Sequence, residues 1–387
     1  MDQRPSRLAS CLLALGWAVA AADEPTPARE RVEVRAATGS RTLEGTVVVE
    51  AADGGLLLEL DDQRYDLLQP DTIAARRPLA ADPPEQSPRE LGRRILGELP
   101  PGFDLHVTKH YVVCFDTSRE YAVWCAALFE RLFDTFATYW SNAGLEIRRP
   151  DRPLVVVIFA DRHDYEAFAA RDLGAAADRV VGYYNLLSNR VTTFDLTGND
   201  AVVRPAGRPP GRAGTEILAS PEAAGLVSTL VHEATHQMAF NTGMHRRLAP
   251  VPVWVSEGIA TCFETPDLKN ARGWRGIGGV NRARLEHYLK THRPGGLREI
   301  VADDAAFRAA QTGLDAYARA WALTHFLMTT ERDAFAAYLG AIAAKPPCGA
   351  DSATRRLEEF EAAFGKTPDA IEDAVHRAMA RLASRRP

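Results

Sequence analysis

One predicted helix constrains the fold of this chain more than any other feature. Residues 220–222 read Ser-Pro-Glu, which combines a capping side chain, proline in the first turn and an acidic residue. We therefore expect a helix that begins here and runs to about Asn241. Within it, His232 and His236 are four residues apart, so both imidazoles lie on one face, one turn from each other.

Two histidines at this spacing are typical of a pair that binds one metal ion. Glu233 follows the first of them and points to the adjoining side, where it can reach a water on the metal without being a ligand. The alternative is a pair of histidines that binds no metal. A third ligand is available in Glu257, because twenty residues separate it from His236 and residues 254–264 have the pattern of a second helix. We predict one Zn²⁺ per chain, bound by His232, His236 and Glu257.

The pattern H-E-x-x-H followed by W-x-x-E-G-x-A resembles the gluzincin branch of zinc metallopeptidases, which includes thermolysin-like and aminopeptidase-type enzymes. The resemblance implies that His232, His236 and Glu257 are the zinc ligands. It also implies that Glu233 is the general base of peptide-bond hydrolysis.

The same resemblance implies a tyrosine on a later helix that stabilises the oxyanion. Tyr317 lies sixty residues past Glu257 and is the candidate, although Ala320 stands where that segment usually has glycine. Family members often place a carboxylate four residues after the glutamate ligand to orient a histidine, but this chain has Thr261 there. Glu264 is a candidate for that orienting role, although we favour the interpretation that it is a solvated helix residue.

The chain more closely resembles a bacterial family of exported, uncharacterised proteins, domain of unknown function 1570, which is placed in the peptidase-MA-like group. The resemblance covers roughly residues 105–380. Besides the zinc motifs, it depends on residues 110–113, 182–185, 189–191 and 317–327. It implies a zinc peptidase without defining its substrate.

We expect a peptide or protein substrate that lies extended along an edge strand of the sheet. Residues 180–184 and 190–194 are predicted to form a hairpin, and we place the edge at Arg190 to Asp195. No strand of the Gly-Ala-Met-Glu-Asn type precedes the zinc helix, so an endopeptidase is favoured over an aminopeptidase. The candidate substrate-binding residues are Tyr184, Asn185, Val191, Thr192 and Thr193.

The predicted fold class is α+β. Residues 23–75 alternate apolar and polar positions between Asp/Gly turns, which predicts a small antiparallel barrel or meander, and we favour an SH3-like β-barrel. Residues 76–104 are rich in proline and are predicted to be a linker. Residues 105–387 are predicted to form a zincin-like metallopeptidase domain, with a small mixed sheet over residues 105–220 and helices over residues 221–387.

Residues 1–22 are typical of a signal peptide, with Arg4 and Arg7 before a short apolar run and small residues at the cleavage site. We therefore expect export to the periplasm or the medium. An uncleaved membrane anchor is less favoured, because the run is shorter than the ~20 residues of a spanning helix. The net charge of −5 gives no sign of a nucleic-acid partner, and nothing in the sequence predicts an oligomeric state.

Other functional interpretations remain open. Residues 23–75 are predicted either to contact peptide or cell-envelope material or, as we favour, to act as a packing or spacer module. The whole chain has an alternative role as a zincin-fold binding or scaffold protein of the cell envelope that has lost catalysis. Intact Glu233 favours hydrolysis, and a ligand set that leaves one zinc position open favours catalysis over a structural site.

Overall fold

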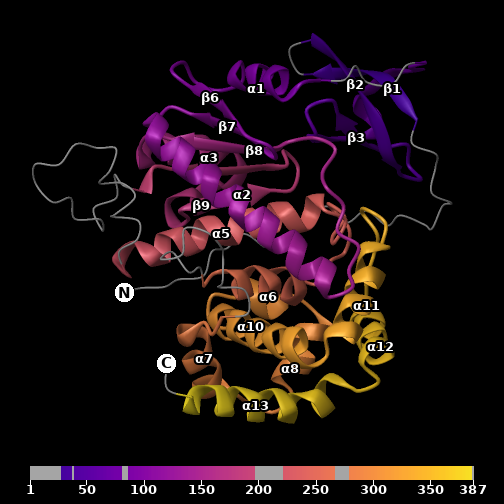
Figure 1. The fold of residues 1–387 in the computed structure, drawn as a ribbon. Coiled ribbons are helices and arrows are strands. Elements are labelled where there is room, and N and C mark those ends of the chain that lie inside the picture. The colour runs from indigo at the N-terminus through magenta and orange to yellow at the C-terminus, as the bar shows by residue number, and fades with distance from the viewer. Residues whose placement is uncertain (1–27, 37–38, 81–85, 197–220, 266–278, 386–387) are drawn as a thin grey trace, which may run out of the picture.

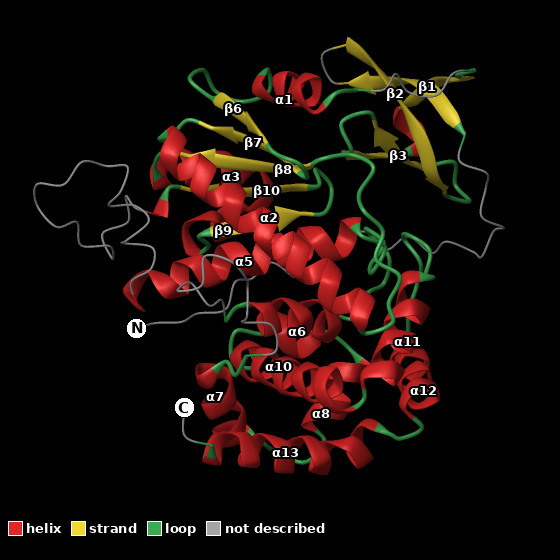
Figure 2. Ribbon diagram, in the orientation of Figure 1, coloured by secondary structure: helices red, strands yellow, loops and turns green. Residues whose placement is uncertain are grey.

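The computed structural model describes residues 28–36, 39–80, 86–196, 221–265 and 279–385. Two five-stranded sheets precede a long run of helices (Figure 2). In Figure 1 the N-terminal sheet lies at the upper right, the second sheet lies beside it, and the helices after residue 252 lie below both. The predicted α+β class, with a β-rich N-terminal region before a helical one, is therefore confirmed.

The N-terminal sheet is an antiparallel meander with the strand order β4-β3-β2-β1-β5. Its apolar positions alternate toward a small separate core, as the period-two pattern predicts. Among the described strands, β4 and β5 are both edges, so the sheet is open: the SH3-like barrel that we favoured is wrong, and the alternative of a meander is confirmed. The strands are β1 (Arg29–Ala36), β2 (Gly39–Glu50), β3 (Leu56–Leu60), β4 (Tyr65–Leu68) and β5 (Ile73–Pro78).

The stretch predicted as a linker, residues 76–104, contains a helix. Strand β5 continues to Pro78, and α1 covers Pro88–Leu96. Ser87 and Glu90 form a capping box at its start. Leu91 and Ile95 are buried in the main hydrophobic core, so tertiary packing retains a helix that the proline-rich composition concealed.

The second sheet has the order β6-β7-β8-β10-β9. Its three central strands run parallel, and an antiparallel strand lies at each edge. Helices α2 (Arg119–Asn142) and α3 (Arg162–Leu173) connect the parallel strands. The strands are β6 (Asp104–Val107), β7 (Tyr111–Phe115), β8 (Leu154–Phe159), β9 (Gly182–Asn185) and β10 (Arg190–Phe194).

Helix α5 (Pro221–Asn241) lies between this sheet and the remaining helices (Figure 1). Below it, α6 packs closely against α10, and almost every residue of α10 is buried. No helix within the described ranges combines the length and apolar character needed to cross a bilayer. The remaining helices are α6 (Val253–Phe263), α7 (Arg282–Thr291), α8 (Gly296–Ala302), α9 (Ala305–Arg308), α10 (Gly313–Thr330), α11 (Arg332–Ala343), α12 (Ala353–Phe364) and α13 (Pro368–Ser384).

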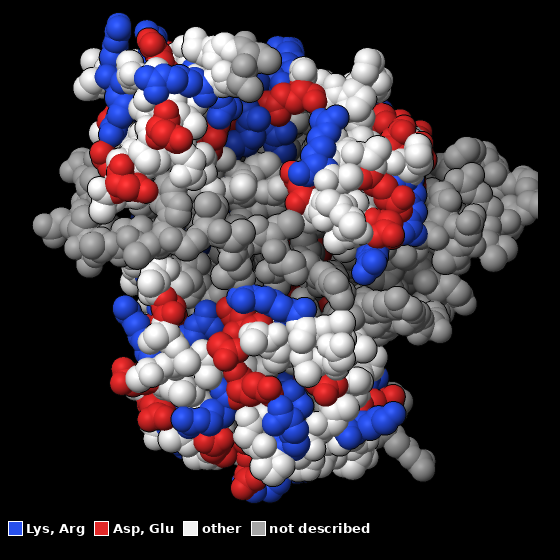
Figure 3. Space-filling model, turned by 180° about the vertical axis from the view of Figure 1, so that it is seen from behind, with Lys and Arg blue, Asp and Glu red and all other residues white. Residues whose placement is uncertain are grey.

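Charge on the molecular surface is mixed. Figure 3 shows Lys and Arg intermingled with Asp and Glu over the described residues of the face seen from behind. Such a pattern is typical of a solvated surface. The expectation that nucleic acid is not a partner stays a prediction.

Candidate metal centre

Helix α5 places the two histidines in a buried environment. The apolar side chains of this helix face the core and are at most 1% exposed (Val227, Leu230, Val231, Ala234 and Met238). His232 and His236 are 5% and 7% exposed, and Glu233 between them is 1% exposed. Polar groups buried this deeply need partners, so the surrounding contacts indicate what the site is built to hold.

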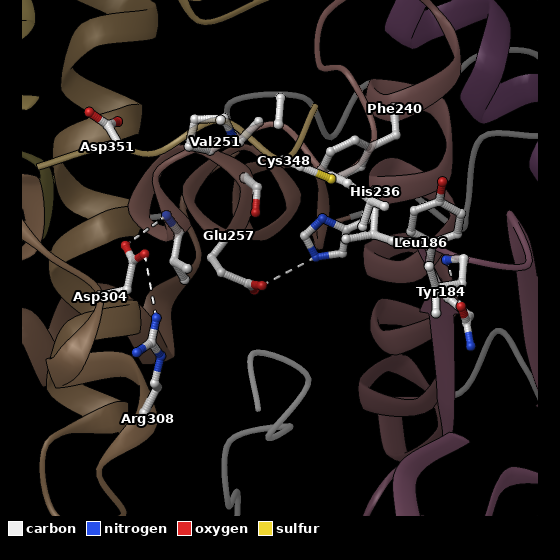
Figure 4. A pocket seen from close by; sticks show the side chains of 18 of the residues that line it. Tyr184, Leu186, His236, Phe240, Val251, Glu257, Asp304, Arg308, Cys348 and Asp351 are labelled. Atoms are coloured by element: carbon white, nitrogen blue, oxygen red, sulfur yellow. Dashed lines mark hydrogen bonds and ion pairs between the residues drawn. The ribbon is translucent and has the colours of Figure 1, made fainter. Parts of the chain in front are cut away.

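Helix α6 brings Glu257 to the two imidazoles. The Nε2 atoms of His232 and His236 are 3.0 Å apart, and Glu257 Oε2 lies 3.1 Å from the first while Oε1 lies 3.5 Å from the second. Figure 4 shows Glu257 and His236 pointing toward each other across the pocket. Tetrahedral zinc with bonds of about 2.0–2.2 Å keeps its ligand atoms about 3.3–3.6 Å apart. The three side chains therefore fit one zinc ion with little adjustment.

The glycine after Glu257 allows α6 to approach α10. A Cβ at Gly258 would lie 2.1 Å from Thr324 Oγ1 and 2.9 Å from the carbonyl oxygen of Ala320. Both distances are far below van der Waals contact, and one partner is backbone, so any side chain here would force the helices apart. In the motif, the ligand Glu257 is therefore followed directly by the glycine that lets α6 approach α10.

The start of α6 is held by a residue far away in the sequence. Pro252 is the N-cap residue and offers no capping side chain, so the N–H of Val253 donates instead to Asp304 Oδ1 at 3.1 Å. Asp304 is fixed in turn by two hydrogen bonds from Arg356, at 2.7 and 3.0 Å. The Asp304 carboxylate therefore caps α6, the helix that carries Glu257, although it belongs to a different segment of the chain. The sequence analysis missed this residue.

Glu264 orients the first histidine. His232 Nδ1 lies 2.7 Å from Glu264 Oε1, and Asn281 Nδ2 donates to Glu264 Oε2 at 3.2 Å. An imidazole that donates from Nδ1 keeps the lone pair of Nε2 for a metal, which is the usual arrangement around a ligand histidine. The interpretation of Glu264 as a solvated residue was therefore wrong, and the side chain is 14% exposed.

Glu233 has one satisfied oxygen and one unsatisfied oxygen. Its Oε2 accepts the backbone N–H of Tyr184 in β9 at 2.9 Å. Its Oε1 is buried and finds no hydrogen-bond partner among the described residues. Burial raises the pKa of the Glu233 carboxyl, against the opposing charge of His232 and His236. An unpartnered buried oxygen beside the ligands is suited to accept a proton from a water molecule.

The charges of the ligands are coupled. Burial lowers the pKa of the His232 imidazole, but hydrogen bonds to Glu257 and Glu264 outweigh burial and hold that pKa well above its usual value. Burial raises the pKa of the Glu257 carboxyl, but the charges of His236 and His232 outweigh burial and hold it well below its usual range. The raised pKa favours the protonated imidazole of His232 in the protein without metal, so a metal ion competes with a proton there.

The edge strand beside the site is β9. The prediction that Arg190 to Asp195 forms the edge is wrong, because β10 pairs with β8 on one side and with β9 on the other. The predicted hairpin itself is confirmed. Tyr184 and Asn185 line the cleft beside the ligands, whereas the other candidates for substrate binding lie on the internal strand and do not line this cleft (Val191, Thr192 and Thr193).

The cleft has a volume of about 830 Å³ and is lined by Glu233, His236 and Glu257 together with β9. Clefts of this size are typical of ligand sites. Tyr317 is not among the described residues that line it, and lies 2% exposed against Phe307. This position does not support the oxyanion role that the resemblance implies, and that role stays an untested prediction.

Comparison with known families supports the closer resemblance. Residues 226–349 match the family model described as "Protein of unknown function (DUF1570)". The match includes the zinc motifs and Tyr317, but it covers only part of the span predicted from the sequence. No curated protein matches the chain. The family description names no activity, so the chemistry has to be argued from the site.

Proposed function

We propose that the chain is a zinc-dependent peptidase, and more specifically an endopeptidase. The observation that carries this proposal is the environment of Glu233. One oxygen of this buried carboxylate is held by the edge strand, the other has no partner among the described residues, and Glu233 lines the same cleft as the ligands His236 and Glu257. A purely structural metal site has no use for such a carboxylate, and it usually has four protein ligands, whereas the described part of the chain brings three together here.

The ligand set is His232, His236 and Glu257, and Zn²⁺ bound there would supply a Lewis acid that acidifies a water and polarises a carbonyl. Glu233 Oε1 accepts the proton of the attacking water and passes it to the leaving amine. The N–H of Tyr184 keeps the Glu233 side chain oriented for this transfer.

The substrate is an extended stretch of peptide or protein. Of the strands that the structure describes, β9 pairs with β10 alone, so its other edge is the one that we assign to backbone hydrogen bonds with such a chain. The N–H of Tyr184 faces away from β10 and is already donated to Glu233, so the alternating register leaves the carbonyl of Tyr184 and the backbone groups of Gly182 for the substrate. Asn185 closes this strand at its C-terminal end.

Export remains part of this proposal. Residues 1–22 have the composition of a signal peptide and lie outside the described residues. A peptidase with this leader acts on substrates outside the cytoplasm, in the periplasm or the medium.

The test is cleavage of an unfolded protein by the zinc-loaded chain, analysed by mass spectrometry. We expect cleavage that a chelator abolishes and zinc restores. Glu233→Gln is expected to keep its zinc and lose activity by about 10²–10⁴-fold. Glu361→Gln makes the same isosteric change on an exposed glutamate of α12 and is expected to retain full activity.

Two results would separate this proposal from its alternative. If the Glu233→Gln variant kept its activity, the Glu233 carboxylate would have no role in the reaction. Stoichiometric zinc without cleavage of any peptide by the unmodified chain would instead favour the alternative of a binding protein that keeps the fold without catalysis.

A further inference from the structure

The N-terminal sheet contacts the site through the β9–β10 turn. Asn189 in this turn donates to Gln63 Oε1 at 3.1 Å, and Gln63 Nε2 donates to the carbonyl of Pro153 at 3.0 Å. The N–H of Tyr65, the first residue of β4, donates to the carbonyl of Leu187 at 2.7 Å. These bonds fix β4 beside the C-terminal end of β9, the strand along which we propose that the substrate binds.

Charged groups in the same contact are buried. Arg190 is 7% exposed and pairs with Asp62 at 3.4 Å and with Glu98 at 2.9 Å, while Asp62 is 1% exposed. The guanidinium of Arg247 lies 3.7 Å from the ring centre of Tyr65. Buried charges of this kind need their partners in place, so the sheet is a fixed part of the site and not a detached spacer.

Strand β4 also contributes to the cleft. Leu67 lines it together with His236 and Glu257, and its side chain is half-buried. Several apolar side chains of the same cleft are likewise half-buried, so each keeps surface open to the cavity (Leu186, Phe240, Leu248 and Val251). These five side chains offer no polar partner to a charged ligand group, although the exposed Arg171 and Asp172 also line the cleft.

The opposite part of the cleft has a different character. Figure 4 shows Asp304, Arg308 and Asp351 on one side of Glu257, and Leu186 and Phe240 on the other side, beyond His236. The charged groups already have partners, since Asp304 pairs with Arg308 at 3.8 Å and Asp351 accepts from Lys345 at 2.7 Å. The apolar part of the cleft is therefore the part that can select among peptides by burying one of their side chains.

We propose that the N-terminal sheet completes an apolar substrate subsite, to which it contributes Leu67. The peptide segment bound there carries a large apolar side chain such as Phe or Leu. Burial of such a side chain against these apolar groups is favourable, whereas a carboxylate or ammonium would lose its water there without gaining a partner from them. This inference depends on the proposed function, because it assigns specificity to the same cleft.

The test measures binding and does not require cleavage. A positional-scanning library of decapeptides is bound to zinc-loaded Glu233→Gln, and pools with Phe or Leu at one position are compared with pools that carry Glu or Lys there. We expect the apolar pools to bind about tenfold tighter, the discrimination usual for one apolar pocket. Equal binding of all pools would overturn the inference.

Two variants of Leu67 assign the preference to the sheet. Leu67→Glu is expected to abolish the roughly tenfold tighter binding of the apolar pools and to favour the Lys pools. Leu67→Lys is expected to favour the Glu pools instead. Opposite changes cannot come from a general loss of folding. Val123→Glu places the same charge on the exposed surface of α2 and is expected to keep the parent ranking.

The outcomes distinguish the two proposals. A parent ranking that both Leu67 variants leave unchanged would contradict the subsite while the peptidase proposal stands. Failure of the unmodified chain to cleave any peptide would contradict the peptidase proposal, and the binding ranking would still decide the subsite.

Discussion

The two walls of the cleft are held by different kinds of interaction. The helical wall, which carries the ligands, is held by close apolar packing: α6 meets α10 at Gly258, and Trp254 is fully buried between aromatic rings. The strand wall is held by a buried polar network. Asn189 bonds to Gln63, and it exchanges two hydrogen bonds with Asn241 of α5 at 2.7 and 2.8 Å.

This difference indicates a division of roles. Packing of α6 against α10 and against α5 places Glu257 opposite the two histidines of α5, so that the three ligand atoms converge as a metal requires. The polar network joins the N-terminal sheet, the hairpin and α5, and Tyr184 adds its hydroxyl to it by donating to Asn189 at 2.7 Å. We therefore expect changes to the helical wall to affect zinc first, and changes to the strand wall to affect peptide binding first.

The largest expected effect comes from Gly258→Ala. The new methyl group meets Thr324 and the backbone of Ala320, so we expect a loss of about 3 kcal/mol in the free energy of unfolding together with weaker zinc binding. Denaturant unfolding measures the loss. The control is Gly340→Ala in α11, where an added Cβ meets nothing within 4 Å and where we expect stabilisation of up to about 1 kcal/mol. Similar results for both variants would mean that the close helix approach is unimportant.

Glu264→Gln is expected to have the next largest effect. The amide keeps the shape of the side chain but removes the charge that accepts from His232 Nδ1, so zinc affinity should fall about 10–100-fold. Competition with a chromophoric chelator measures it. Unchanged affinity would show that the contact at 2.7 Å does not orient the ligand.

Asn189→Gly tests the strand wall. Asn189 has a φ of 59°, which glycine adopts without strain, so this change removes only the side chain from the network. We expect a loss of about 1–2 kcal/mol in unfolding free energy and a higher KM for peptides, with zinc affinity preserved. Asn189→Ala should lose about 1 kcal/mol more, because alanine is strained at this φ. Loss of zinc in the glycine variant would contradict the division of roles.

The smallest effect concerns pH. The pKa of His232 lies above its usual value in the protein without metal, so zinc has to displace a proton. Affinity should therefore fall as the pH falls, by about tenfold, or about 1.4 kcal/mol, per unit for each displaced proton. The same raised pKa stabilises the metal-free fold below the unfolded pKa of about 6.5, and this contribution is lost as the pH rises through the folded value. Chelator competition at several pH values measures the slope, and a flat profile would contradict the proton at His232.

Sequence alone predicted the part of the site that depends on helix periodicity. His232, Glu233 and His236 lie on one helix, and Glu257 follows at a spacing that a helix pair accommodates. The hairpin was likewise visible, since two short apolar runs lie on either side of a turn that ends at Asn189. In each case the signal and the structure are local.

The errors arose where distant parts of the chain meet. Apolar alternation does not tell an edge strand from a central one, so β10 was placed at the edge although two strands flank it. Gln63 and Asp304 lie 126 and 51 residues from the groups that they hold, and no local pattern predicts such pairs. The N-terminal sheet was predicted to be a packing or spacer module, and no local pattern shows which surface it packs against, because its contacts with the hairpin exist only after folding.

The most direct test of the central claim is the amount of zinc per chain. Elemental analysis of the purified chain, after dialysis against zinc and then buffer, is compared with the same measurement on Glu257→Gln. The account predicts about one zinc in the parent and much less in the variant. No bound zinc in the parent, or one zinc in both proteins, would contradict the metal centre formed by His232, His236 and Glu257.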